Sequence, residues 1–353
     1  MFENRANPLL EWYEKEKRSL PWREEATPYH VWVSEIMLQQ TRVEAVKRYY
    51  ERFLEKLPTI EALAKCEEET LLKLWEGLGY YNRVKNMQKA AKFLVEQYGG
   101  QMPSDYGKIL ELPGIGSYTA GAIASIAFGI KKPAVDGNVL RVLARQEEWE
   151  ADIAKASTKK QAELILEEQI PEQFPGEFNQ SLMELGATVC LPNGMPKCEK
   201  CPILSFCKSK KHDTIKKYPR KSGKIKRRIE KKTVLLIQNQ RGFAVRKRSN
   251  EGLLAGMYEF PNLDGFLSEK QILAYVEEQN LVPIRIKKIE DAKHIFSHIE
   301  WQMQGYSVLV EGTVKENKKE FLFINREEAL QDYPIPSAFL AYKKYIEEKA
   351  AKE

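Results

Sequence analysis

The stretch LPGIGSYTAGAIASIA, residues 112–127, decides the fold of the N-terminal half of the chain. Gly114 and Gly116 allow a tight turn between a short helix and a second helix, because glycine adopts backbone angles that other residues avoid. Exposed N–H groups at the start of the second helix can hold a phosphate, so the stretch suits a helix-hairpin-helix contact to a DNA backbone. A plain turn between two helices is the alternative interpretation.

Asp136 lies downstream of this hairpin, in AVDGNV, residues 134–139. It comes just before Gly137 and a predicted helix. An aspartate in that position is commonly an N-cap, whose carboxylate accepts a hydrogen bond from a backbone N–H of the first turn. A catalytic role is the alternative, and it depends on the residues that accompany Asp136.

A second carboxylate lies upstream, in SEIMLQQTRV, residues 34–43. On a helix, Glu35, Gln39 and Arg42 share one face, beside apolar residues that should turn toward a core. A carboxyl group on a partly apolar helix can have a raised pKa, as a general acid requires. A surface glutamate paired with Arg42 is equally compatible with these residues.

The segment around these motifs has a helical pattern. From Asn7 to Val189 apolar residues recur with helical spacing, for example from Val31 to Leu54 and from Asn82 to Tyr98, with breaks at Pro and Gly. No convincing alternating strand interrupts the pattern. We therefore expect an all-α first domain, residues 1–210.

Four of the five cysteines are close together and follow the pattern C-x7-C-x2-C-x5-C: Cys190, Cys198, Cys201 and Cys207. Four thiolates in so short a stretch can bind a tetrahedral zinc ion or a [4Fe-4S] cluster, and the spacing alone does not choose between them. The grouping favours a metal centre in a reducing cytoplasm over disulfides. Cys66, in a polar helix far away, is interpreted as an ordinary, partly buried thiol.

A basic segment follows the cysteines. Between Lys208 and Lys232 thirteen lysines and arginines face only Asp213 and Glu230, which predicts a linker over residues 211–231. A solvated tether and a phosphate-attracting segment are both compatible with this composition. Beyond it, β-branched runs alternate with turn-formers and with helical patterns near Glu269 to Glu278 and Pro336 to Glu348. Residues 232–353 should therefore form an α+β domain.

The composition sets wider bounds. The 353 residues suggest about two domains, and 43% hydrophobic content supports sizeable cores. The 56 Lys+Arg and 50 Asp+Glu leave a formal charge of +6, which by itself names no partner. No apolar run approaches the roughly 20 residues of a membrane helix, and the first residues are too charged for a signal peptide. We expect a cytoplasmic protein with no membrane partner.

Together these motifs resemble the MutY adenine DNA glycosylases of the helix-hairpin-helix superfamily. The match extends through GLGYYNRVKN, FNQSLMELGATVC and the four-cysteine loop, and continues past the linker in GLLAGMYEFP and FSHIEW. The resemblance implies a [4Fe-4S] cluster on the four cysteines. It also implies removal of adenine mispaired with 8-oxoguanine, or with guanine, in double-stranded DNA by a monomeric, nucleoid-associated repair enzyme.

The resemblance assigns roles to individual residues. Glu35 would be the acid that protonates adenine, Asp136 the ionised carboxylate that stabilises the sugar cation or attacks it, and Tyr118 and Asn138 neighbours of the sugar. Bifunctional relatives carry a lysine two residues after the second hairpin glycine, where it attacks the sugar as an amine. Tyr118 occupies this position, so we predict a monofunctional glycosylase.

DNA contacts follow from the same resemblance, since the enzyme must extrude adenine from the duplex. Gln40 and Tyr80 would enter the base stack, with Thr41 and Leu78 beside them. Arg23 and Trp22 would line the adenine pocket, although Leu78 and Trp22 also fit a core role. The first cysteine gap holds seven residues where the family commonly has six, which puts the DNA contact of that loop in doubt.

The C-terminal domain resembles the Nudix fold, but the Glu-rich helix G-x5-E-x7-R-E-x2-E-E does not appear in the sequence. Mg²⁺ is poorly held without clustered carboxylates, so we expect a domain without hydrolytic activity. The resemblance implies that Phe296, Ser297 and His298 meet 8-oxoguanine; a surface histidine at a strand end is the alternative for His298. Two other functions compete: a glycosylase for another mismatch, such as thymine opposite guanine, and a non-catalytic Fe-S DNA-binding protein.

Overall fold

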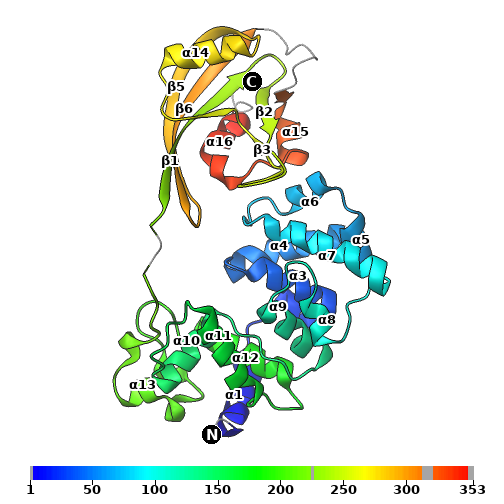
Figure 1. Ribbon diagram of the computed structural model, residues 1–353, viewed down its shortest axis with the longest axis vertical. Coiled ribbons are helices and arrows are strands. Elements are labelled where there is room, and N and C mark those ends of the chain that lie inside the picture. Colours follow the sequence, from blue (N-terminus) through cyan, green and yellow to red (C-terminus); the bar gives the residue numbers. More distant parts are fainter. Residues whose placement is uncertain (1–2, 224–225, 312–320, 349–353) are drawn as a thin grey trace. The chain divides into compact units, whose positions relative to one another are not determined.

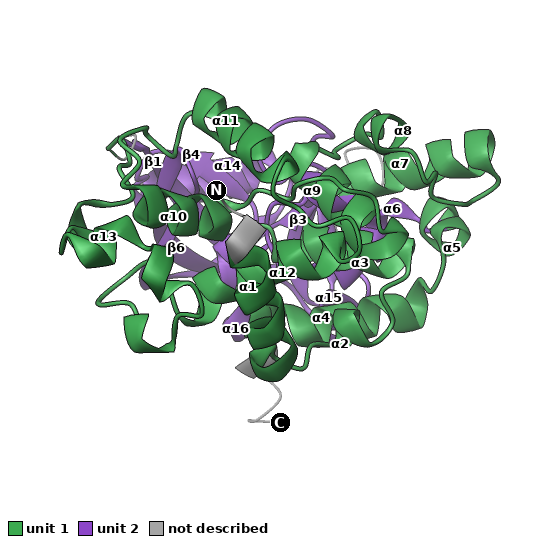
Figure 2. Ribbon diagram, turned by 90° about the horizontal axis from the view of Figure 1, so that it is seen from below, with its two compact units in different colours: residues 1–65, 85–223 green, residues 66–84, 224–353 purple. Residues whose placement is uncertain are grey.

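The computed structural model describes residues 3–223, 226–311 and 321–348 of the chain. They form two compact units: residues 1–65 with 85–223, and residues 66–84 with 224–353. Figure 1 shows the elements along the chain, and Figure 2 distinguishes the two units by colour. Within the described residues, no helix combines the length and apolar composition needed to cross a membrane.

The first unit is helical, as the sequence predicts. Its longer helices are α1 (Glu3–Glu16), α3 (Pro28–Leu38), α4 (Val43–Lys56), α7 (Asn82–Tyr98, whose first turn falls in the second unit), α10 (Gly137–Glu147), α11 (Ala156–Glu167) and α12 (Pro175–Thr188). The shorter ones are α2 (Pro21–Glu24), α5 (Ile60–Lys65), α8 (Tyr106–Leu110), α9 (Ser117–Ala122), the π-helix η1 (Ile123–Ala127), η2 (Cys198–Lys200), η3 (Leu204–Phe206), α13 (Lys208–Lys211) and η4 (Ile215–Lys217).

Apolar burial explains the arrangement of this unit. Helix α3 is buried on nearly all sides, with Trp32, Val33 and Met37 fully shielded from solvent. A separate cluster joins α1, α10, α11 and α12 through residues such as Leu9 and Phe178. A helix that is apolar all round belongs in the interior, so α3 carries its single buried carboxyl, that of Glu35, into the unit.

One helical expectation was wrong. The stretch from Val31 to Leu54 forms two helices rather than one, because α3 ends at Leu38 and α4 begins at Val43. Neither Pro nor Gly causes the break. Gln40 lies in the left-handed backbone region, with φ of 58°, and the Thr41 N–H returns to the Leu38 carbonyl over 3.2 Å. A left-handed residue ends a helix whatever its side chain.

The second unit contains a sheet of order β3-β2-β1-β6-β5, in which β4 also pairs with β1 and β7 with β2. Strands β1 and β6 are parallel, and the other pairs are antiparallel. The strands are β1 (Arg228–Gln238), β2 (Phe243–Lys247), β3 (Tyr258–Glu259), β4 (Asn262–Asp264), β5 (Val282–Ile295), β6 (Ile299–Glu311) and β7 (Leu322–Ile324).

Helices cover both faces of this sheet. Val234 and Leu236 point to one face, where they pack with α15 (Arg326–Gln331), η5 (Ser337–Phe339) and α16 (Leu340–Glu348). Leu235 and Ile237 point to the other, toward α14 (Glu269–Glu278). This alternation follows from the two-residue period of a strand. The predicted α+β class is confirmed.

The boundaries differ from the expected residues 1–210, 211–231 and 232–353. The first unit extends to residue 223, because Ile215 and Tyr218 are buried in it and Arg145 Nε donates to the Tyr218 carbonyl over 3.1 Å. Strand β1 already begins at Arg228. Helix α6 (Glu68–Leu74) groups with the second unit although its sequence lies within the helical half.

Candidate active site

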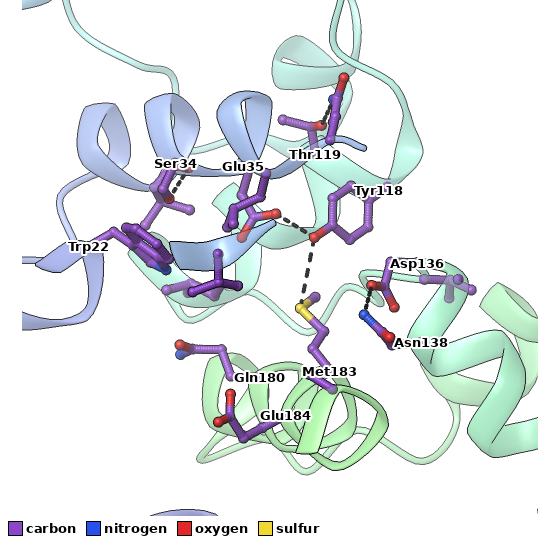
Figure 3. Close-up of a pocket in the computed structure, with 18 of the residues that line it drawn as sticks. Trp22, Ser34, Glu35, Tyr118, Thr119, Asp136, Asn138, Gln180, Met183 and Glu184 are labelled. Carbon is purple, nitrogen blue, oxygen red and sulfur yellow. Dashed lines mark hydrogen bonds between the residues drawn. The ribbon is translucent and has the colours of Figure 1, made fainter. Parts of the chain in front are cut away.

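A pocket of about 660 Å³ lies in the first unit and receives most of the residues that the sequence singled out. Figure 3 shows how its labelled side chains converge from separate elements. They are Trp22 from α2, Ser34 and Glu35 from α3, Tyr118 and Thr119 from α9, Asp136 and Asn138 at the start of α10, and Gln180, Met183 and Glu184 from α12. The volume suits a small organic ligand.

Glu35 is the buried acid of this pocket, with 6% of its surface exposed. Burial raises its pKa from 4.5 to about 7; the hydrogen bond from Tyr118 acts in the opposite direction, and the nearby Asp136 carboxylate raises the pKa further. Loss of solvent disfavours the charged carboxylate. The side chain therefore retains a proton near neutral pH and can donate it.

Tyr118 lies two residues after Gly116, in the first turn of α9. Its hydroxyl donates a short hydrogen bond to Glu35 Oε2 and lies 3.9 Å from Met183 Sδ. Burial and the neighbouring carboxylates raise its pKa well above 10, so the phenol stays protonated. A tyrosine carries no amine and therefore cannot form a Schiff base with a sugar, which supports the prediction of a monofunctional enzyme.

Asp136 has the N-cap geometry that the sequence allowed, and it also lines the pocket. Its carboxylate accepts a hydrogen bond from the Val139 N–H over 2.8 Å and another from Asn138 Nδ2 over 2.7 Å. Burial nevertheless raises its pKa above 3.8, against these hydrogen bonds. The cap thus holds in place a carboxylate that lines the pocket.

Arg141 connects this aspartate to the cysteine loop. Its Nη2 donates to Asn138 Oδ1 over 2.8 Å, and its Nε donates to the Cys190 carbonyl over 2.8 Å. Asn138 in turn donates to Asp136. A continuous set of hydrogen bonds therefore runs from the first cysteine of the loop to the active-site carboxylate. The sequence placed Arg141 on a helix but assigned it no role.

The floor of the pocket is held by a second charged group that the sequence did not single out. Glu184 is almost fully buried and pairs with Arg18 Nε over 2.6 Å and with Arg23 Nη2 over 2.8 Å. Arg23 Nε and Tyr13 Oη both donate to Gln180 Oε1, over 3.2 and 3.0 Å. The sequence did offer one signal for Glu184: α12 carries polar residues at positions that are otherwise apolar.

The hairpin has the predicted form. Gly114 adopts φ of 79°, and a Cβ there would meet the Asn86 side chain at 2.6 Å, so glycine is required on both counts. Gly116 is the N-cap of α9, and both glycines are exposed. The first N–H groups of α9 have no partner within the helix. Phosphate binding by Gly114 and Gly116 remains a prediction.

A second hollow, of about 730 Å³, adjoins the pocket. Its lining shares Gln40, Asp136 and Asn138 with the first pocket and adds Asn193 from the cysteine loop together with Lys216 and Lys221. Part of the basic segment thus lies beside the active site of the same unit. This placement favours a role in attracting phosphates over that of a tether alone.

The four cysteines of the loop line one cavity, together with Arg145 and Ile215. They form no disulfide, and Arg145 Nη1 lies 3.3 Å from Cys190 Sγ. No three metal-binding side chains among the described residues converge closely enough for a single ion. In a [4Fe-4S] cluster each thiolate binds a different iron, so its ligands lie farther apart than those of one zinc ion. The four cysteines that line this cavity can supply the ligands of either group, and the choice between zinc and the cluster stays a prediction.

The expected DNA contacts fall in both units. Trp22 is buried against Tyr50, with ring centroids 5.5 Å apart, and it also lines the pocket with Arg23, Gln40 and Thr41. Leu78 is 5% exposed, which agrees with its alternative interpretation as a core residue. Tyr80, in contrast, is half exposed, with φ of 49°.

The remaining contacts lie in the second unit. Phe296, Ser297 and His298 form the turn between β5 and β6. Phe296 packs against Trp301 at a centroid distance of 4.9 Å, whereas the other two are exposed. Ser297 Oγ lies 3.2 Å from Tyr80 Oη. The structure therefore brings Tyr80 and this turn together, although they are far apart in the sequence.

Comparison with known proteins finds a matching family for each half of the chain. Residues 33–172 match the HhH-GPD superfamily of base excision DNA repair proteins, and residues 233–345 match the NUDIX domain. A thermostable thymine-DNA glycosylase aligns with a TM-score of 0.53 and 29% identity over 60% of this chain and 96% of its own. Endonuclease III in complex with DNA shares the fold, with a TM-score of 0.51 and 24% identity over 60% of this chain and 98% of its own.

Curated relatives are similar over most of the chain. The adenine DNA glycosylase of Homo sapiens is 35% identical over 86% of this chain and 66% of its own length, and that of Mus musculus is 36% identical over 86% and 70%. The adenine DNA glycosylase of Buchnera aphidicola (strain Bp) is 36% identical over 82% of both chains. The chain therefore belongs to the adenine DNA glycosylase family of base excision DNA repair enzymes.

Proposed function

We propose that this enzyme excises adenine mispaired with 8-oxoguanine, or with guanine, in duplex DNA, and that it does not cut the strand. The observation that carries the proposal is the pair of carboxyl groups in one pocket, that of Glu35 buried and that of Asp136 partly buried, with the pKa of Glu35 raised to about 7. Adenine is a poor leaving group, so its departure requires an acid that is still protonated at neutral pH.

Glu35 delivers its proton to N7 of the extruded adenine while the C1′–N9 bond breaks. Positive charge then develops on the sugar, and the Asp136 carboxylate stabilises it or bonds to it briefly before water adds at C1′. The hydrogen bonds from Val139 and Asn138 fix that carboxylate. Tyr118 keeps the Glu35 carboxyl oriented through its hydroxyl.

Gln40 and Tyr80 are assigned to the base stack, which must be filled when adenine leaves it. Each has a backbone in the left-handed region, a conformation that residues other than glycine adopt rarely. Thr41 and Leu78 support them. Phe296, Ser297 and His298 are assigned to the base opposite adenine, whose N7–H and O8 offer a donor and an acceptor.

Replacing Glu35 with Gln tests the chemistry. The amide keeps the shape of the side chain but carries no transferable proton, so single-turnover release of adenine from an 8-oxoguanine:A duplex should fall by at least about 100-fold. DNA binding should persist. A duplex with thymine opposite guanine, included because one similar structure is a thymine-DNA glycosylase, should give no release by the unaltered enzyme.

Two outcomes would contradict this assignment. Near-normal adenine release by Glu35→Gln would rule out the acid role of Glu35. Borohydride trapping of the unaltered enzyme on DNA in high yield would show an amine attack on the sugar, and therefore a bifunctional enzyme.

We also propose that Cys190, Cys198, Cys201 and Cys207 bind a [4Fe-4S] cluster with a structural role near the DNA. Their shared cavity supports this assignment. Purified protein should be brown, with a broad absorbance near about 410 nm from thiolate-to-iron charge transfer, and Cys198→Ser should reduce the iron content and the thermal stability. A colourless protein loaded with zinc would contradict the cluster. Cys66→Ser is the matched control, since Cys66 is remote in sequence.

A further inference from the structure

The segment of residues 66–84 interrupts the helical half of the sequence but groups with the C-terminal sheet in the second unit (Figure 2). It contains helix α6 and ends in the turn that carries Tyr80. Polar contacts at two positions join α6 to the C-terminal domain. We call the group formed by Lys73, Glu76 and Lys343 the lysine clamp.

The lysine clamp is a shielded network. Lys73 Nζ donates to the carbonyls of Ala329 and Tyr333, over 3.0 and 3.1 Å, and pairs with Glu76 at 2.8 Å. Glu76 also pairs with Lys343 at 2.5 Å. The three side chains are only 12–16% exposed. An ion pair away from solvent is screened less than a surface pair, and removing one partner leaves a charge uncompensated.

Glu69 makes the second connection, one helical turn before Lys73. It accepts a hydrogen bond from Lys247 Nζ over 2.6 Å and another from Tyr258 Oη over 2.9 Å. Residues four apart lie on the same face of a helix. One face of α6 therefore attaches to strands β2 and β3 and, through the lysine clamp, to α15 and α16.

The turn after α6 is held just as closely. Trp75 Nε1 donates to the Gly79 carbonyl over 3.1 Å, and Arg83 Nη2 donates to the carbonyls of Leu78 and Gly79 over 3.1 and 3.0 Å. The Arg83 guanidinium also lies 5.5 Å from the centre of the Tyr80 ring. The base of Tyr80 is fixed by this turn, while its hydroxyl reaches Ser297.

We propose that the lysine clamp is a positioning device for lesion recognition, which holds Tyr80 against Ser297 so that both meet the base opposite adenine as one preformed surface. Lys73, Glu76 and Lys343 act through the segment and do not touch DNA. A preformed contact surface avoids the entropy of ordering it upon binding. The inference rests on the proposed function, because it assigns these residues to the selectivity for 8-oxoguanine.

The test uses Lys343→Met in the full-length protein. Single-turnover excision is measured on 8-oxoguanine:A and guanine:A duplexes, and the ratio of the two rates should fall by about tenfold, or about 1.4 kcal/mol, while guanine:A excision stays close to normal. Lys344→Met is the matched control: it removes the same charge from the next residue, whose half-exposed ion pair with Glu290 is not part of the clamp. Its ratio should be unchanged.

Two further variants separate positioning from a general loss of structure. Lys343→Arg keeps a cation beside Glu76 and should retain the ratio. In a Tyr80→Ala background, Lys343→Met should cause no additional loss, because the clamp acts through Tyr80. Additive losses, or an equal fall of both excision rates, would overturn the proposal.

The two proposals fail in different ways. If the unaltered enzyme shows no preference for 8-oxoguanine, the proposed function fails. If it shows the preference and Lys343→Met retains it, only the positioning role of the clamp fails.

Discussion

At the scale of single residues, two opposing effects set the pKa of Glu35, the proposed acid. Burial favours the protonated form of Glu35, whereas the hydrogen bond from Tyr118 favours the carboxylate. The resulting pKa of about 7 leaves the group able to give up its proton at neutral pH. A fully desolvated carboxyl without the phenol would hold its proton more tightly and transfer it less readily.

Tyr118→Phe tests this balance. The proposed mechanism requires protonated Glu35, so the excision rate of the unaltered enzyme should decline as the pH rises through about 7. Without the tyrosine hydrogen bond the pKa of Glu35 rises, and the declining limb should move to higher pH even if the maximal rate is lower. Single-turnover excision between about pH 5 and pH 9 measures the limb. A limb that stays in place, or moves to lower pH, would show that Tyr118 does not set this pKa.

At the scale of elements, helices whose apolar residues recur with helical spacing were predictable from the sequence. Irregular features were not. Helix α7 spans Asn82–Tyr98 as expected. The break at Gln40 has no signal in the sequence, because glutamine is an ordinary helix former and its left-handed conformation depends on the surrounding fold. Strand β5 also escaped prediction: it is an edge strand with mostly exposed side chains, and the alternation of Val282, Ile284 and Ile286 is lost in the polar stretch that follows.

The residues of the candidate site also divide into those that the sequence predicted and those that it missed. Glu35 and Asp136 were identified because each belongs to a recognisable motif. Arg141 and Glu184 were missed because their roles depend on contacts with residues more than forty positions away, such as Arg141 with Cys190 and Glu184 with Arg18. Spacing along one helix indicates which face a residue occupies but not what meets that face.

Close packing of α9 gives a prediction at this scale. A Cβ at Gly121 would lie 2.0 Å from the Pro133 carbonyl oxygen, a backbone atom that cannot move without shifting the segment before Asp136. Gly121→Ala should therefore reduce the free energy of unfolding by about 1–3 kcal/mol and reduce adenine excision. Gly223→Ala is the control, because no atom lies within 4 Å of a Cβ there. Equal urea midpoints for the two variants would contradict the packing argument.

At the scale of the whole molecule, the chain divides its tasks in a way that the order of the sequence conceals. The acid pocket, the hairpin and the cysteine loop lie in one unit, whereas Tyr80 and the turn of residues 296–298 lie in the other. The proposed function therefore assigns selectivity for the opposite base to the second unit and removal of adenine to the first. Substitutions in the second unit should therefore alter the selectivity for the opposite base more than the rate of adenine removal.

Charge is also distributed unevenly over the molecule, and the formal total of +6 conceals this. Lys216 and Lys221 line the hollow beside Asp136, and neither forms an ion pair with a described residue. Lys208 and Lys232, from the same basic segment, pair with Glu147 at 2.6 Å and with Asp264 at 2.5 Å. Lysines without an acidic partner are the ones available to phosphates.

Two double variants with the same loss of charge should therefore behave differently. In a Glu35→Gln background, which prevents excision, Lys216→Gln with Lys221→Gln should weaken duplex binding and reduce the slope of log affinity against log salt by about 1.8, or about 0.9 for each lost phosphate contact. Lys208→Gln with Lys232→Gln should change the slope much less, because these lysines are already neutralised by carboxylates. Equal slopes for the two variants would mean that net charge alone, rather than the position of the lysines beside the pocket, attracts the DNA.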